Sequence, residues 1–198
     1  LVVSIGDGES GVAWLIPDRV TAPFAAAGEP CGQTWPALGT IEGAVSAANE
    51  WRVDVTGIPH RTVMIHSITP KIIDRDPIPD GSTVYVCPVG GGSSERVASL
   101  DLTSPGDTEY WGADAPALRG LSYQLTPEEH GTFYVAHRDQ QVAQSIYRFE
   151  LVMEYSDELG THEVNLNELA GREPFVSVES CGVPVVDVDS PAAPSECP

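Results

Sequence analysis

Histidines have the widest chemical range of any residue type in this sequence, because an imidazole can bind a metal ion or move a proton near neutral pH. The chain contains His60, His66, His130, His137 and His162. None belongs to an H-x-H, H-x-x-x-H or H-E-x-x-H pattern, the spacings that place two imidazoles on one side of a metal ion. We therefore predict no metal centre, and we expect each histidine to lie on the surface or to be hydrogen-bonded within the fold.

The segment from Gly6 to Gly11 matches the G-x-G-x-x-G pattern of dinucleotide-binding loops. Such a loop requires a helix directly after its third glycine, because the helix N-terminus binds the phosphates. Here a short apolar run, Val12 to Ile16, follows and is stopped by Pro17. We expect a hairpin turn at this place and no nucleotide or other cofactor.

Two catalytic patterns are incomplete. His137, Arg138 and Asp139 match the start of a kinase catalytic loop, but Gln144 stands where the metal-binding asparagine would be, and no D-F-G follows. The G-x-S-x-G motif of many serine hydrolases is also absent, although a sandwich can bring a distant serine, histidine and acid together. We predict no catalytic residue and retain a secreted hydrolase as an alternative.

Acidic residues lie in or beside several predicted turns, where calcium sites are often built. They include Asp74, Asp76, Asp80, Asp101, Asp107 and Glu109. Because no EF-hand spacing is present, we expect solvated carboxylates and no metal ligand, with a calcium site as the alternative.

Tyr110 and Trp111 stand between acidic and proline-rich turns, in a segment without clear alternation. Aromatic side chains at such a place either plug the end of a sandwich or offer a rigid apolar contact to a partner. We expect the plug role, with the partner contact as the alternative, and these two residues are the candidate binding residues.

The elements that must position these residues are β-strands, since apolar residues recur with a period of two between turn residues. In the run from Ser145 to Tyr155, for example, Tyr147, Phe149, Leu151 and Met153 alternate with more polar residues. The predicted strands are 12–16, 51–56, 62–68, 83–87, 96–102, 121–125, 132–137, 145–155, 162–166 and 174–178. About ten strands at this spacing predict an all-β fold, an antiparallel β-sandwich.

Helix is scarce, with at most one or two short helices. Alanines favour one over Ile41 to Asn49, and Thr126-Pro-Glu-Glu has the cap, proline and acidic residues of a first helical turn. We assign residues 1–180 to a single β-sandwich domain. Residues 181–198 are expected to form a C-terminal tail rich in proline, alanine and serine, tethered through a disulfide.

The charge of the chain excludes several classes of partner. Ten basic residues stand against 29 acidic ones, the net charge is −19, and Lys71 is the single lysine. Nucleic acids and anionic membranes are bound largely by neutralising phosphates, so both are poor partners. No stretch approaches the roughly 18 apolar residues of a membrane helix, and we expect no direct membrane insertion of the domain.

Several short motifs occur in a recognisable order along the chain. They are Cys31-x-x-x-Trp35, Trp51 to Gly57, Thr62 to Ile65, Ile72 to Arg75, Cys87 to Gly92, Leu100 to Leu102, Thr126 to Glu129 and Pro174-Phe175. In this order they resemble the exported β-rich domain of uncharacterised membrane-anchored proteins of actinobacteria. The resemblance covers most of residues 12 to 178 and carries over no catalytic residue. It implies a place outside the membrane, and the acidity is equally consistent with a halophile.

Four cysteines without a C-x-x-C pair, Cys31, Cys87, Cys181 and Cys197, suit two disulfides, with free thiols as the alternative. The resemblance places Cys31 and Cys87 near one end of the sandwich, and the loop from Cys181 to Cys197 is short. We therefore prefer these two pairings over the two other connectivities. Because the chain begins at Leu1, we also expect that an N-terminal leader or anchor has been removed.

Together these features favour an extracellular or cell-surface bacterial protein that acts as a binding or protein-interaction module without catalysis. Its partner would be a protein or another component of the cell envelope. A structural subunit of a surface or virion assembly and a secreted hydrolase are the alternatives.

Overall fold

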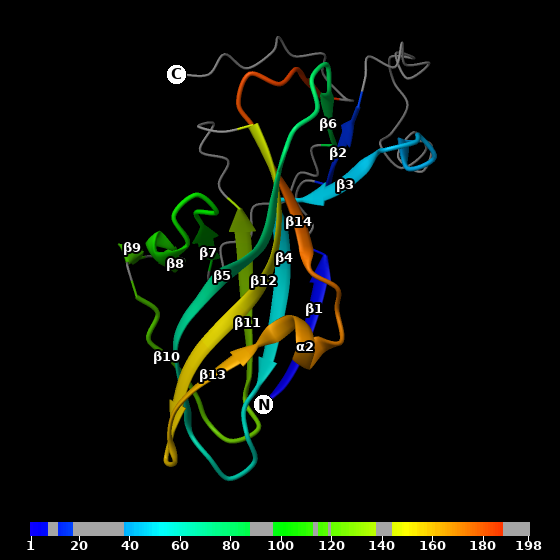
Figure 1. Cartoon of the computed structure of the whole chain (residues 1–198). Helices are drawn as coiled ribbons and strands as arrows, with labels where there is room; N and C mark the ends of the chain where they lie inside the picture. The colour runs from blue at the N-terminus through cyan, green and yellow to red at the C-terminus, as the bar shows by residue number, and fades with distance from the viewer. Residues whose placement is uncertain are drawn as a thin grey trace.

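The computed structural model describes residues 1–7, 12–17, 38–87, 97–112, 115–118, 120–137 and 144–187. These residues form three sheets of mostly antiparallel strands, a short α-helix and one 3₁₀ turn (Figure 1). The predicted all-β, sandwich-like fold is confirmed. Within the described part no helix has the length and apolar character needed to span a membrane.

The largest sheet has six strands. In spatial order they are β1 (Val2–Asp7), β4 (Glu50–Thr56), β11 (His130–His137), β7 (Val97–Leu100), β8 (Glu109–Gly112) and β9 (Ala115–Leu118). The pair β11 and β7 is parallel, and the other neighbours are antiparallel. The 3₁₀ turn, Pro105–Asp107, precedes β8.

The second sheet is built on two long antiparallel strands, β5 (Val63–Pro77) and β12 (Gln144–Asp157), whose register shifts twice. β10 (Tyr123–Leu125) pairs with β5. β13 (Gly160–Asn165) and β14 (Phe175–Ser180) pair with different halves of β12. The helix α2 (Leu166–Ala170) directly follows β13.

A third, smaller sheet lies at the upper end of the molecule in Figure 1. Its order is β15 (Val185–Asp187), β6 (Thr83–Cys87), β2 (Val12–Ile16) and β3 (Val45–Ala48). β15 pairs with β6 in parallel and lies inside the segment expected to be a tail. Val183, in the same segment, is buried in the core under this sheet. Residues 188–198 of the expected tail lie outside the described residues.

Two apolar cores, with a small third cluster of Ile16, Leu38 and Tyr85, stabilise these layers. The larger core lies between the first two sheets and contains Trp51, Phe149 and Phe175, with ring centroids 4.8 to 5.7 Å apart. The smaller core lies beneath the third sheet and includes Ile146 and Val178. Each core removes its side chains from water, which is the main driving force for folding.

Both expected helical segments have another structure. Val45–Ala48 is the strand β3, because pairing with β2 and burial of Ala47 outweigh the helix propensity of alanine. Thr126 to Glu129 is a tight turn between β10 and β11, closed by a hydrogen bond from Glu129 N–H to Thr126 O, with Glu128 at φ 63°. Proline followed by a residue with positive φ is typical of a type II turn.

Candidate functional site

Three buried polar side chains and the half-buried Asn49 lie together where the two cores meet. Asn49 stands between β3 and β4, where the chain passes from the small sheet to the six-stranded sheet. His137 ends β11, and Ser177 and Glu179 belong to β14. We call Asn49, His137, Ser177 and Glu179 the polar cluster.

Strand alternation explains why these polar residues are buried. In β11, Phe133 and Val135 face the core, and His137 is the next residue on that face. In β14, Ser177 and Glu179 lie on the same face of the strand as the buried Phe175. Two apolar stripes therefore continue into polar residues, which meet each other inside the fold.

The polar cluster is closely hydrogen-bonded. His137 Nε2 lies 3.1 Å from Glu179 Oε1, and His137 Nδ1 lies 2.6 Å from Ser177 Oγ. Ser177 Oγ lies 3.2 Å from Asn49 Oδ1, to which it donates. The backbone N–H of His137 donates to Asn49 O at 2.8 Å.

The proton positions in the polar cluster depend on the tautomer of His137. A proton on Nε2 serves the contact with the Glu179 carboxylate, and Nδ1 then accepts from the Ser177 hydroxyl or, if it also carries a proton, donates to it. The side chains of His137 and Glu179 are both 0% exposed.

Further charged groups surround the polar cluster. Partial burial acts to raise the pKa of Asp101, but hydrogen bonds from Thr103 and Ser104 and the charge of His137 outweigh it, so that this pKa is lowered. Burial raises the pKa of Tyr147, although the Arg75 guanidinium, 5.2 Å from the ring centroid, acts in the opposite direction.

The sequence of groups from Ser177 through His137 to Glu179 is that of a nucleophile, a base and an acid. Ser177 is 0% exposed, however, so a substrate cannot reach its hydroxyl in this structure. Buried charges need compensating partners, and this polar cluster supplies them. The arrangement fits a structural link between the two cores better than a catalytic centre.

A second polar group lies where β12 turns into β13. The Asp157 carboxylate accepts hydrogen bonds from His162 at 2.9 Å, from Leu159 N–H at 2.8 Å and from Arg61 at 3.2 Å. These bonds, that of His162 first, lower the pKa of Asp157. The His162 ring also stacks on Tyr155, with 5.0 Å between centroids. This group fixes the hairpin.

The structure describes the side chain of only one of the two candidate binding residues. Tyr110 is buried in β8, and its hydroxyl both donates to Ile68 O at 3.0 Å and accepts from Ile68 N–H at 2.9 Å. Burial raises the pKa of Tyr110 to about 12. This is the plug role, so Tyr110 offers no exposed contact. The side chain of Trp111 lies outside the described residues, and its binding role stays a prediction.

The predicted disulfide framework is seen only at one residue. Cys181 is disulfide-bonded. The side chains of Cys31, Cys87 and Cys197 lie outside the described residues. The connectivity therefore stays a prediction.

The acidic turn residues and the glycine-rich segment add no site. Among the described residues no group of three or more histidines, cysteines or carboxylates is arranged to hold a metal ion. Asp101 binds its own turn instead. The first strand, β1, extends through Gly6 to Asp7, and Gly8 to Gly11 lie outside the described residues.

Comparison of the chain with models of known families, with curated proteins and with solved structures finds no match.

Proposed function

We propose that this protein is an extracytoplasmic binding or protein-interaction module of a bacterial cell envelope and that it performs no catalysis. The observation that carries the proposal is the complete burial of Ser177 and Glu179. They belong to the one nucleophile, base and acid set that we find in the described part of the chain. Because no substrate can reach these side chains, we assign them a role in stability. We therefore look for the function of the protein on its surface.

The charge supports a protein as the partner. A net charge of −19 repels phosphates and attracts positively charged protein surfaces, which also accelerates association at low salt. The disulfide at Cys181 supports an oxidising compartment outside the cytoplasm. The resemblance to exported actinobacterial domains favours the same location, and a cell-surface anchor belongs to this proposal.

A serine-reactive probe tests the absence of catalysis. The folded protein is incubated with a fluorophosphonate, which labels activated and accessible serines, beside a Ser177→Ala variant. We expect no labelling of either protein. Labelling at Ser177, or hydrolysis of an ester or peptide that Ser177→Ala abolishes without unfolding the protein, would overturn the proposal.

A reconstitution experiment tests the binding role. The immobilised chain is exposed to envelope proteins of its source organism with and without free chain as competitor, and captured proteins are purified and measured individually. We expect one of them to bind saturably with fixed stoichiometry. If no purified protein binds at micromolar concentration, the module has no partner of the proposed kind.

A further inference from the structure

Among the strands that the structure describes, β13 lies at the edge of the second sheet. Its one strand partner among the described residues is β12, and α2 follows it along the chain without covering its length. An edge strand exposes a row of unpaired N–H and C=O groups, which another extended chain can join by strand addition.

The hydrogen-bond pattern shows which groups face outward. The Tyr110 hydroxyl is hydrogen-bonded to both the N–H and the C=O of Ile68, so these two backbone groups point away from β12. Ile68 lies opposite Met153 in the antiparallel pair, and the backbone groups of Met153 therefore point away from β5 and toward β13. The backbone N–H of Leu151, two residues earlier in β12, points to the same side and donates to Asn167 Oδ1. Met153 pairs with Val164, so the backbone groups of the next residue, Glu163, face outward from the sheet.

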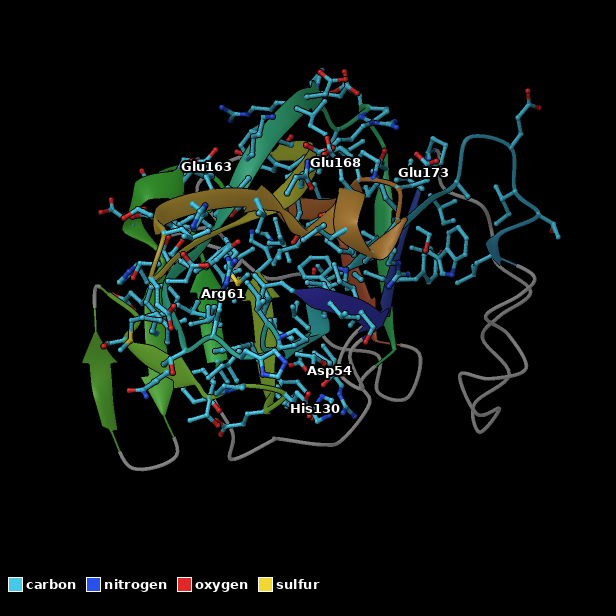
Figure 2. All side chains as sticks on the ribbon, turned by 90° about the horizontal axis from the view of Figure 1, so that it is seen from below. Asp54, Arg61, His130, Glu163, Glu168 and Glu173 are labelled. Atoms are coloured by element: carbon cyan, nitrogen blue, oxygen red, sulfur yellow. The ribbon has the colours of Figure 1, made fainter. Side chains whose placement is uncertain are left out.

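An acidic pair lies on this edge strand and its neighbour β12. Glu163 lies directly opposite Glu154 in the register, both are exposed, and neither forms an ion pair with a described residue. Like charges in opposite positions repel each other and weaken a strand pair. Figure 2 shows Glu163, Glu168 and Glu173 in a row along β13, α2 and the segment that follows.

An apolar position accompanies these charges. Leu159, in the turn that starts β13, is 69% exposed. Exposed apolar side chains next to an open strand edge create an aggregation risk unless charges or a partner protect them. The carboxylates at 154 and 163 repel a second copy of this chain, whose net charge is −19. They attract a basic segment.

We propose that β13 binds an extended, lysine- or arginine-rich segment of another protein, which adds to the sheet as a strand next to Glu163. The backbone groups of Thr161 and Glu163 hold the segment, and its basic side chains lie over Glu154 and Glu163. This inference rests on the proposed function, of which it specifies the surface and the partner class.

The test uses a synthetic peptide of four Lys-Val repeats as the probe. Its controls are the Glu-Val peptide of the same length and a Lys-Val peptide interrupted by proline, which cannot pair as a strand. Binding is measured by fluorescence anisotropy, and amide hydrogen exchange is followed at Thr161 and Glu163. We expect the Lys-Val peptide alone to bind and to slow exchange at these two amides.

Three variants separate charge from backbone pairing. Glu163→Lys reverses the charge, and Glu163→Pro removes an outward N–H without removing a bond to β12. Asp80→Lys is the matched charge reversal in the exposed turn before β6. We expect both Glu163 variants to weaken binding at least about tenfold and Asp80→Lys to change it less than about threefold.

Each result decides a separate point. Equal binding of the proline-interrupted peptide, equal losses in Asp80→Lys and Glu163→Lys, or unchanged exchange at Glu163 would show attraction by overall charge and would overturn the inference. If a reconstituted envelope partner binds all Glu163 variants with the affinity of the wild-type protein, the assignment of β13 as the binding edge is wrong, while the proposed function remains. Labelling of Ser177 would remove the proposed function itself, whatever the peptide does.

Discussion

The contact between His137 and Glu179 gives the sharpest stability prediction. At 3.1 Å and an effective dielectric constant of about 20, this pair gains about 5 kcal/mol of Coulomb energy if His137 carries protons on both ring nitrogens. Much of this gain offsets the desolvation of two side chains that are fully buried. The net stabilisation is therefore small, whereas the loss of one partner leaves the other charge buried without compensation.

The consequence is a non-additive pair of substitutions. We expect His137→Leu and Glu179→Met each to lower the free energy of unfolding by about 3 to 5 kcal/mol. The double variant should lose only about 1 to 2 kcal/mol, because an apolar pair of similar volume removes both charges and Ser177 still donates to Asn49. The double variant is thus more stable than either single variant.

Urea unfolding of the oxidised protein at pH 7 measures these differences. Trp51, 2% exposed in the larger core, supplies a fluorescence signal for unfolding of that core. Equal slopes of free energy against urea among the variants are required for the comparison. A double variant that loses the sum of the two single losses would refute the buried ion pair.

Four further predictions concern other parts of the molecule. Tyr110→Phe leaves the buried N–H and C=O of Ile68 without their partner and should cost about 1 to 3 kcal/mol in urea unfolding, with Tyr134→Phe as the control. Glu128→Gly should stabilise by up to about 1 kcal/mol, since glycine accepts positive φ without strain, and a loss would show that the turn needs its side chain. The pKa of Asp157 is lowered, so its stabilisation is complete above the unfolded value near 4 and disappears as pH falls through the folded value; Asp157→Asn should flatten acid unfolding measured below about pH 5. Sodium chloride should raise the melting temperature by screening 29 acidic residues, and calcium at equal ionic strength should add nothing, whereas an excess of several degrees would reveal a metal site.

The strands of the larger core were predictable because their residues alternate strictly. Tyr147, Phe149, Leu151 and Met153 are each 0 to 1% exposed, as the period of two in β12 predicts. Local signals failed where tertiary contacts dominate. The alanines of β3 favour a helix in isolation, but pairing with β2 and burial of Ala47 in the smaller core stabilise a strand instead.

The polar cluster could be predicted only in part. Continuing the alternation of Phe133 and Val135 indicates that His137 faces the core, and the same step from Phe175 reaches Ser177 and Glu179. The prediction ended this strand at Val178 and so omitted Glu179. That β11 and β14 meet at these residues depends on sheet topology, which no local pattern contains.

We propose that the function of this protein lies on its acidic surface and not in the polar cluster. The most direct measurement compares the dissociation constants of the Lys-Val peptide for the wild-type protein, Ser177→Ala and Glu163→Lys, each shown to be folded by its unfolding curve. We expect Ser177→Ala to bind within about threefold of wild type and Glu163→Lys to bind at least about tenfold more weakly. Weaker binding by Ser177→Ala together with unchanged binding by Glu163→Lys would contradict this proposal.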